Sequence, residues 1–256
     1  MNQRPGFPVK LDKPGGQTPA KTGATPIPRI PISTPAVAPS GLGLDSVAVR
    51  ERMVAKLKAQ GLQDALVLTA MGQVERHRFV ESALVNQAYE DTSLPIGLGQ
   101  TISKPNVVAR MIELLRAGHP GKLGRVLEVG TGCGYQAAVL SQVAIEVYSI
   151  ERLKVLHEKA RENLRHFRLR NVHLLFGDGM LGYPQGAPYA GIISAAGGME
   201  IPQSWMDQLA PGGRIVAPTV TPAGHQALVV IEKTGRGFKH SVMDTVHFVP
   251  LKSGVA

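Results

Sequence analysis

The sequence has few of the residues that mark a disulfide-rich, membrane-spanning or base-stacking protein. Its 256 residues include one cysteine, Cys133, so no internal disulfide can form and a reducing compartment is expected. No apolar run approaches the roughly 18 residues that a bilayer requires, and the first residues lack the apolar core of a secretion signal. Aromatic residues make up 5% of the chain, too few to predict a stacking surface for single-stranded nucleic acid. We therefore expect a cytoplasmic protein with no membrane partner.

Positive charge is the strongest bias in the composition. The formal net charge is +9 at pH 7, which favours acidic partners such as nucleic acid or anionic lipid. The basic residues are scattered, however, and their densest group, residues 161–170, has helical spacing. A solvated helix face explains that spacing better than an RNA-binding stripe, so nucleic acid is not an expected partner. A monomer is the default expectation.

Residues 1–44 differ in composition from the rest of the chain. Nine of the 19 prolines fall in this segment, mixed with Gly, Thr, Ser and Ala. Proline lacks an amide donor and fixes φ, which disfavours helices and central strands, and the segment cannot bury enough apolar surface to offset chain entropy. We expect a disordered, partly polyproline-like tail, followed by one folded domain at residues 45–256.

The spacing of apolar residues changes once within that domain. Residues 45–118 predict a helical lead-in and substrate segment, with helices at residues 47–60, 64–71, 76–84 and 105–116 and an irregular stretch at 89–103. In residues 119–256, helices at 135–143, 153–166 and 203–209 alternate with short apolar strands at 125–129, 146–150, 172–176, 189–194, 214–217, 227–232 and 245–249. Such alternation predicts an α/β fold. We expect a Rossmann-like, doubly wound, mostly parallel sheet with a helical N-terminal cap and antiparallel C-terminal strands.

A glycine-rich loop follows the first expected strand of this core. A dinucleotide site has the spacing G-x-G-x-x-G, whereas here the glycines run G-x-G-x-G and an acid lies two residues before the first. A carboxylate suits an amine better than a pyrophosphate. The pattern resembles the first motif of Rossmann-like methyltransferases. That resemblance implies that S-adenosylmethionine is the cofactor and S-adenosylhomocysteine the product. It implies that both bind at Glu128, Gly130, Thr131, Gly132 and Gly134.

Two further acids follow the next two expected strands. Glu151 ends the second strand, where a carboxylate accepts hydrogen bonds from the ribose hydroxyls in this fold class; otherwise it is a surface acid beside Arg152. Asp178 lies in a Gly-Asp-Gly sequence that, taken alone, is simply a turn. In methyltransferases an acid at this place meets the adenine amino group. With Gly179 and Ala195 these residues complete the expected cofactor site.

The string Pro-Ile-Gly-Leu-Gly-Gln-Thr-Ile-Ser-Lys-Pro occupies residues 95–105. By local physics Ser103 is a candidate helix N-cap, because Pro105 follows just inside the helix. With the cofactor motif, the string resembles the signature of the protein-L-isoaspartate O-methyltransferases, which repair proteins damaged at Asp and Asn. The resemblance covers residues 50–251. It implies that Ser103 is the catalytic residue and that isoaspartyl proteins and peptides are held by Ile96, Gly99, Gln100, Thr101 and Ile102.

The chain departs from that family pattern at three places. Leu98 stands where the family usually has His or Tyr, which is expected to alter substrate contact. Gly197 and Gly198 replace a common Pro-Pro pair, which is expected to loosen a loop near the cofactor. His247 replaces a frequent Arg. None of these changes touches Glu128, Glu151, Asp178 or Ser103, so activity is expected.

The implied chemistry asks little of side chains. A free α-carboxylate has a reference pKa of about 3.5, so it is ionised at neutral pH and needs no general base. Ser103 is then expected to orient the substrate by donating a hydrogen bond. No metal site is predicted, because the eight histidines lack ligand spacing. The alternatives are a methyltransferase acting on RNA or a small molecule, a non-catalytic scaffold that docks partners through its Pro-rich tail, and, disfavoured by the glycine spacing, a nicotinamide-dependent dehydrogenase.

Overall fold

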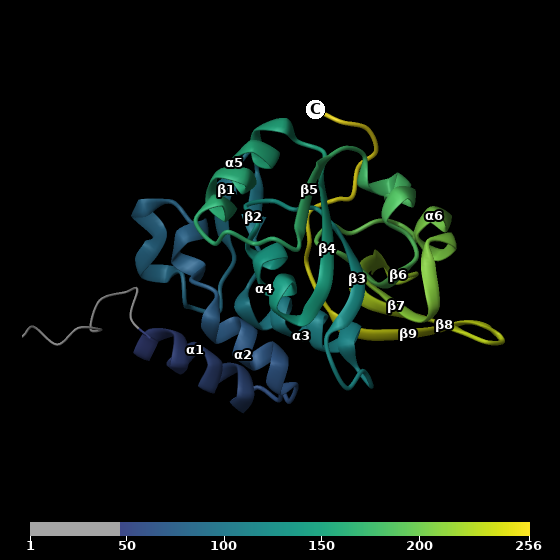
Figure 1. Cartoon of the computed structure of the whole chain (residues 1–256), viewed down its shortest axis with the longest axis horizontal. Helices are drawn as coiled ribbons and strands as arrows, with labels where there is room; N and C mark the ends of the chain where they lie inside the picture. Colours follow the sequence, from purple (N-terminus) through teal and green to yellow (C-terminus); the bar gives the residue numbers. More distant parts are fainter. Residues whose placement is uncertain (1–46) are drawn as a thin grey trace, which may run out of the picture. The chain divides into compact units, whose positions relative to one another are not determined.

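The structure is a computed structural model that describes residues 47–256 (Figure 1). The predicted tail at residues 1–44 lies outside the described residues. The first described element is α1 (Val47–Ala59), and it is followed by α2 (Ala65–Gln73). The Asp64 carboxylate caps α2 by accepting hydrogen bonds from the amides of Leu66 and Val67, which satisfies donors that a helix N-terminus leaves free. The helices predicted at residues 47–60 and 64–71 are confirmed.

The centre of the domain is a seven-stranded sheet with the strand order β5-β4-β3-β6-β7-β8-β9. The strands β3 to β7 are parallel, and β8 and β9 run antiparallel to their neighbours. Figure 1 shows β8 and β9 projecting as a long hairpin. The bounds are β3 (Leu123–Val129), β4 (Ala144–Glu151), β5 (Val172–Phe176), β6 (Tyr189–Ser194), β7 (Leu209–Val220), β8 (Gln226–Thr234) and β9 (Gly237–Thr245).

The buried apolar residues form two separate clusters, one on each face of the sheet. Val126 of β3 joins the cluster that includes α1 to α5, whereas its neighbour Leu127 joins the cluster that contains Trp205. Alternate side chains of a strand point to opposite faces, so both faces are covered, as predicted. The helices on the first face are α3 (Pro105–Arg116), α4 (Tyr135–Val143) and α5 (Lys154–Arg165), and the second face carries the short α6 (Gln203–Asp207).

Three predicted elements differ in the structure, and two 3-10 helices were not predicted. The helix expected at residues 76–84 is two 3-10 helices, η1 (Arg76–Phe79) and η2 (Ser82–Gln87). The stretch expected to be irregular contains a hairpin of β1 (Leu94–Gly97) and β2 (Gln100–Ile102). The last strand is β9, not residues 245–249, because the chain turns back directly after β8. Two further 3-10 helices, η3 (Gly179–Leu181) and η4 (Pro184–Gly186), follow β5.

Arg76 is the largest buried charged side chain next to the hairpin. Its Nε donates to the carbonyl of Ala88 at 2.8 Å, and its guanidinium lies 4.8 Å from the centre of the Tyr135 ring. Ala88 precedes the hairpin and Tyr135 begins α4. Arg76 therefore connects the segment before the hairpin to the helix that follows the glycine loop.

The described residues contain neither a membrane-spanning helix nor a cluster of metal-ligating side chains. Between residues 47 and 256, no helix is both long and apolar enough to cross a membrane. Over the same range, no group of His, Cys, Asp and Glu side chains is placed to hold a metal ion.

Candidate active site

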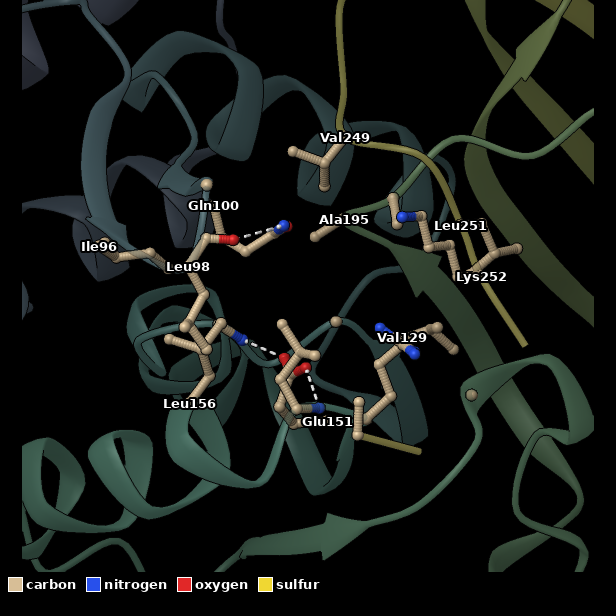
Figure 2. Close-up of a pocket in the computed structure, with 18 of the residues that line it drawn as sticks. Ile96, Leu98, Gln100, Val129, Glu151, Leu156, Ala195, Val249, Leu251 and Lys252 are labelled. Carbon is tan, nitrogen blue, oxygen red and sulfur yellow. Dashed lines mark hydrogen bonds between the residues drawn. The ribbon is translucent and has the colours of Figure 1, made fainter. Parts of the chain in front are cut away.

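A pocket of about 580 Å³ opens at the carboxyl ends of the parallel strands. Its wall includes Gly130 after β3, Glu151 at the end of β4, Gly179 after β5 and Ala195 after β6. Ligands of open α/β sheets bind at this edge. Figure 2 shows Glu151 on one side of the pocket and Ala195 across from it. The structure therefore brings together residues that were predicted from four separate strand ends.

The glycine loop joins β3 to α4 and forms the back of this pocket. Gly134 is the N-cap of α4 with φ 92°, a left-handed conformation that favours glycine. A Cβ at this position would also lie 3.0 Å from Leu164 of α5. Gly130 and Gly132 line the pocket itself. Gly134 thus sets the close packing of α4 against α5, while the other two glycines expose backbone to a ligand.

Glu151 is the acid that holds the loop and faces the pocket. One carboxylate oxygen accepts a hydrogen bond from the Gly132 amide at 2.9 Å, and the other accepts from the Leu153 amide at 2.9 Å. The side chain is 5% exposed. Each oxygen keeps further acceptor capacity. This geometry suits an acceptor for ribose hydroxyls, and Arg152 lines the pocket beside it.

Glu128 lies elsewhere. Its side chain is fully buried and accepts a short hydrogen bond from the Ser149 hydroxyl, which in turn lies 2.6 Å from the Thr131 hydroxyl. Burial raises the pKa of Glu128 to about 8. Glu128 is not one of the described residues that line the pocket. The structure thus places this acid beneath the loop, linked through Ser149 to Thr131, and its expected contact with the cofactor stays a prediction.

Asp178 is likewise turned away from the pocket wall. One carboxylate oxygen accepts from the Met180 amide at 2.9 Å, and the other accepts from the Gly254 amide at 2.6 Å. Its neighbour Gly179 does line the pocket, and a Cβ there would lie 2.4 Å from Val129. The Gly-Asp-Gly sequence is thus a turn, as its local chemistry predicts, and the turn also anchors the end of the chain.

The β1–β2 hairpin forms the opposite side of the pocket. Ile96, Gly99, Gln100 and Thr101 line it, as does Leu98 at the tip. Figure 2 shows the hairpin residues across the opening from Leu251 and Lys252. Leu98 has φ 53° and is 57% exposed. The hairpin is tied to α5 by Lys159, whose Nζ donates to the Ile96 carbonyl at 3.0 Å.

Ser103 lines two small cavities that adjoin the main pocket. It lines a cavity of about 40 Å³ beside the glycine loop and a cavity of about 160 Å³ on the outer side. Thr101 and Ala195 line both of these and the main pocket, and Ile102 lines the smallest one. The expectation that Ser103 caps α3 is wrong, because Lys104 holds the N-cap position before Pro105, and the first-turn amide of Asn106 donates instead to the Asp91 carboxylate at 3.0 Å. The Ser103 hydroxyl is therefore not committed to a helix end.

Sequence reasoning missed the part of the wall that comes from the end of the chain. Val249, Pro250, Leu251, Lys252 and Ala256 line the main pocket. The resemblance to the family extends to residue 251, but residues 245–249 were predicted to form a strand. Periodicity cannot distinguish an apolar run that pairs in a sheet from one that packs against a pocket.

Gly197 and Gly198 do not loosen the loop as expected. The Gly197 amide donates to the Val249 carbonyl at 2.8 Å, and the Gly198 amide donates to the Pro218 carbonyl at 3.3 Å. Proline has no amide hydrogen, so a Pro-Pro pair would lack both bonds. Gly197 therefore ties the loop to the end of the chain and Gly198 ties it to β7, by two bonds that the common pair would lack.

Comparison with known proteins identifies the family. The family model for protein-L-isoaspartate(D-aspartate) O-methyltransferase matches residues 48–256. The chain belongs to the protein-L-isoaspartate O-methyltransferase family. A relative of that name from Methylibium petroleiphilum is 56% identical over 98% of this chain and 96% of its own length. One from Ralstonia nicotianae is 53% identical over 92% of this chain and 78% of its own.

Solved structures agree with this family assignment. A protein-L-isoaspartate O-methyltransferase with 29% identity has a TM-score of 0.72 and is matched over 80% of this chain and 67% of its own. A second, from Plasmodium falciparum and in complex with S-adenosyl-L-homocysteine, has 25% identity and a TM-score of 0.66, over 79% of this chain and 98% of its own. The predicted family, the Rossmann-like fold, the enzyme class and the S-adenosylmethionine cofactor are confirmed. The roles of individual residues in the isoaspartate methyltransferase site stay predictions.

Proposed function

We propose that this chain transfers the methyl group of S-adenosylmethionine to the free α-carboxylate of L-isoaspartyl residues in damaged proteins and peptides. The methyl ester then closes to a succinimide and hydrolyses partly to normal aspartate, which initiates repair. Family membership supports this reaction. The observation that carries it in the structure is the place of Ser103, between a small cavity beside the glycine loop and an outer cavity, both of which share Thr101 and Ala195 with the pocket at the strand ends.

The cofactor half of the proposed site is the pocket at the strand ends. When bound there, S-adenosylmethionine supplies a methyl group activated by its sulfonium charge. Glu151 would accept from the ribose hydroxyls, and Gly130, Gly132 and Ala195 would contact the amino acid half. Arg152 and Gly179 would flank the adenosine, because they lie beyond β4 and β5. Glu128 and Asp178 would act indirectly, through the loop and the end of the chain.

The substrate half of the proposed site is the outer cavity. Lys104 and His247 line it beside Ser103, and the positive charge of Lys104 near the cavity favours an anionic group. The α-carboxylate arrives already ionised, so the side chains orient it and exclude water. Ser103 would donate a hydrogen bond to one carboxylate oxygen while the other faces the methyl group. The contacts of Gly99, Gln100 and Ile102 would position the substrate backbone.

The setting of the enzyme is a further part of the proposal. We expect it to act as a monomer in the cytoplasm, on protein and peptide partners. Its one cysteine supports a reducing compartment, because Cys133 is buried and makes no disulfide. Size-exclusion chromatography with light scattering measures the oligomeric state directly.

Transfer of labelled methyl to two synthetic peptides tests the proposed reaction. The peptides are identical except that one contains an isoaspartyl linkage and the other a normal aspartyl linkage. Base-labile label on the isoaspartyl peptide alone is the expected result, because only that peptide has the free α-carboxylate. Label on neither peptide, with cofactor binding measured in parallel, would overturn the proposal and direct the search to RNA or small-molecule acceptors.

A further inference from the structure

The end of the chain crosses the mouth of the cofactor pocket. After Val249 and Leu251 pair with Gly197 beyond β6, the chain continues to contacts beyond β5 and β4. Figure 1 shows this segment rising past β5 to the end of the chain. We call residues 252–256 the strap. It passes over two of the strand ends where the cofactor site is proposed, those of β5 and β4.

Four backbone contacts hold the strap in place. The Gly254 amide donates to the Asp178 carboxylate at 2.6 Å, and the Gly254 carbonyl accepts from Arg152 Nε at 2.9 Å. The Ala256 amide donates to the Arg152 carbonyl, and the Ala256 carbonyl accepts from the Lys154 amide, both at 2.8 Å. The strap therefore adds a short ladder to the backbone beyond β4, directly after Glu151.

The strap is held by few apolar contacts and many polar ones. Residues 252–256 are exposed, so little buried apolar surface opposes their release. Segments with exposed backbone hydrogen bonds open at low free energy. Lys252 and Ala256 nevertheless line the pocket, so the strap is a wall of the pocket that can open.

We propose that the strap closes over the adenosine end of the bound cofactor and limits the release of S-adenosylhomocysteine. The position of the strap beyond β4 and β5 places it on the adenosine half, whereas the hairpin and the glycine loop enclose the other half. Asp178 acts by anchoring the strap through the Gly254 amide. This inference rests on the proposed cofactor site, but its test uses binding alone and needs no methyl acceptor.

The test compares the full chain with a variant that ends at Leu251. Titration calorimetry measures the dissociation constants of S-adenosylhomocysteine and of 5′-methylthioadenosine, which lacks the amino acid half. Removal of the strap is expected to raise the dissociation constants of both ligands by the same factor, about tenfold. The dissociation rate should rise accordingly, because affinity changes lie mostly in that rate.

A point variant separates loss of the strap from general damage. Gly254→Pro removes the amide that Asp178 accepts and is incompatible with φ 74° at this residue. Gly237→Pro is the matched control, since Gly237 also has positive φ but begins β9, at the β8–β9 hairpin. Gly254→Pro should raise both dissociation constants about fivefold, and Gly237→Pro should leave them unchanged.

Three results would overturn the strap proposal or the function beneath it, and they are distinguishable. Wild-type affinity for both ligands in the shortened chain would reject the strap. If the shortened chain bound S-adenosylhomocysteine more weakly but 5′-methylthioadenosine as well as the full chain does, the place of the strap on the adenosine half would be rejected. Absence of S-adenosylhomocysteine binding in the full chain would instead reject the proposed cofactor site.

Discussion

The floor of the pocket and the hairpin beside it are built in opposite ways. The floor consists of the strand ends, where Glu151 is buried and accepts a hydrogen bond from Gly132 of the glycine loop. The hairpin carries its tip residue Leu98 57% exposed, with a weak hydrogen bond of 3.4 Å from Gln100 to its carbonyl.

This difference separates two demands on one site. A cofactor of constant structure is bound best by a preorganised surface, because little ordering entropy is then lost on binding. A damaged residue arrives in many sequence contexts, which an exposed hairpin can accommodate. Substitutions in the floor should therefore change cofactor affinity strongly, and substitutions in the hairpin should change it little.

The largest effect is expected at Glu151. Glu151→Ala should weaken the binding of S-adenosylmethionine by about 100-fold, since hydrogen bonds to a charged group contribute about 1.5–3 kcal/mol. The bond from Gly132 also fixes the loop. Glu146→Ala is the control, because Glu146 is a half-exposed carboxylate on the same strand, away from the pocket. Calorimetric titration measures both. Near-wild-type binding by Glu151→Ala would break the comparison.

Ser103, between floor and hairpin, should affect the reaction and not the cofactor. Ser103→Ala should lower kcat by about 30-fold, because an orienting hydrogen bond contributes about 2 kcal/mol when it acts on a charged oxygen. The dissociation constant of S-adenosylmethionine should stay within twofold. Steady-state kinetics at saturating cofactor measures the first quantity. Loss of cofactor affinity would contradict the assignment, and Ser241→Ala on β9 serves as the control.

The buried acid beneath the floor should make stability depend on pH. The pKa of Glu128 is raised to about 8, so the folded chain holds a proton that the unfolded chain releases above about pH 4.5. The free energy of unfolding therefore falls as pH rises from about 4.5 to 8. Glu128→Gln should remove this loss, making the variant more stable relative to wild type at pH 9 than at pH 6 by about 1 kcal/mol or more. Thermal unfolding at the two pH values measures it, and an equal difference at both would refute the burial argument.

The smallest effect is expected at the hairpin tip. Leu98→Ala removes an exposed side chain, so kcat/KM for a standard isoaspartyl peptide should change by less than about threefold, or 0.6 kcal/mol. Cofactor affinity should be unchanged. A panel of peptides with apolar or charged neighbours of the isoaspartyl residue would sharpen the comparison, because Leu98 should matter most for the apolar ones. An effect on cofactor binding as large as that of Glu151→Ala would end the distinction between floor and hairpin.

The floor could be predicted from the sequence and the hairpin could not, for a physical reason. Parallel strands end at one edge of a sheet, so Gly130, Glu151 and Ala195 were expected to meet once their strands were assigned. In the hairpin, Pro95 and the glycines beside it interrupt the alternation that marks a strand. Its β-structure depends on pairing between neighbouring segments, which no single segment reveals.

The remaining differences between the predicted and the observed structure depend on which side chains the fold buries. Glu128 and Asp178 were predicted by position in the motif, but whether an acid faces a pocket or supports its wall depends on rotamers and neighbours. The strand predicted at residues 245–249 was wrong because β9, the true edge strand, is exposed along nearly its whole length and lacks an apolar alternation. The apolar residues after it pack against the pocket instead.

The single cysteine gives the molecule a built-in reporter of its own motion. Cys133 lies in the glycine loop, is 3% exposed, and has a pKa raised to about 11 by burial. Only the thiolate reacts, so an alkylating reagent can modify this thiol only when the loop opens. The stoichiometry is one label per chain, and the labelling rate therefore times the opening of the cofactor loop without any engineered probe.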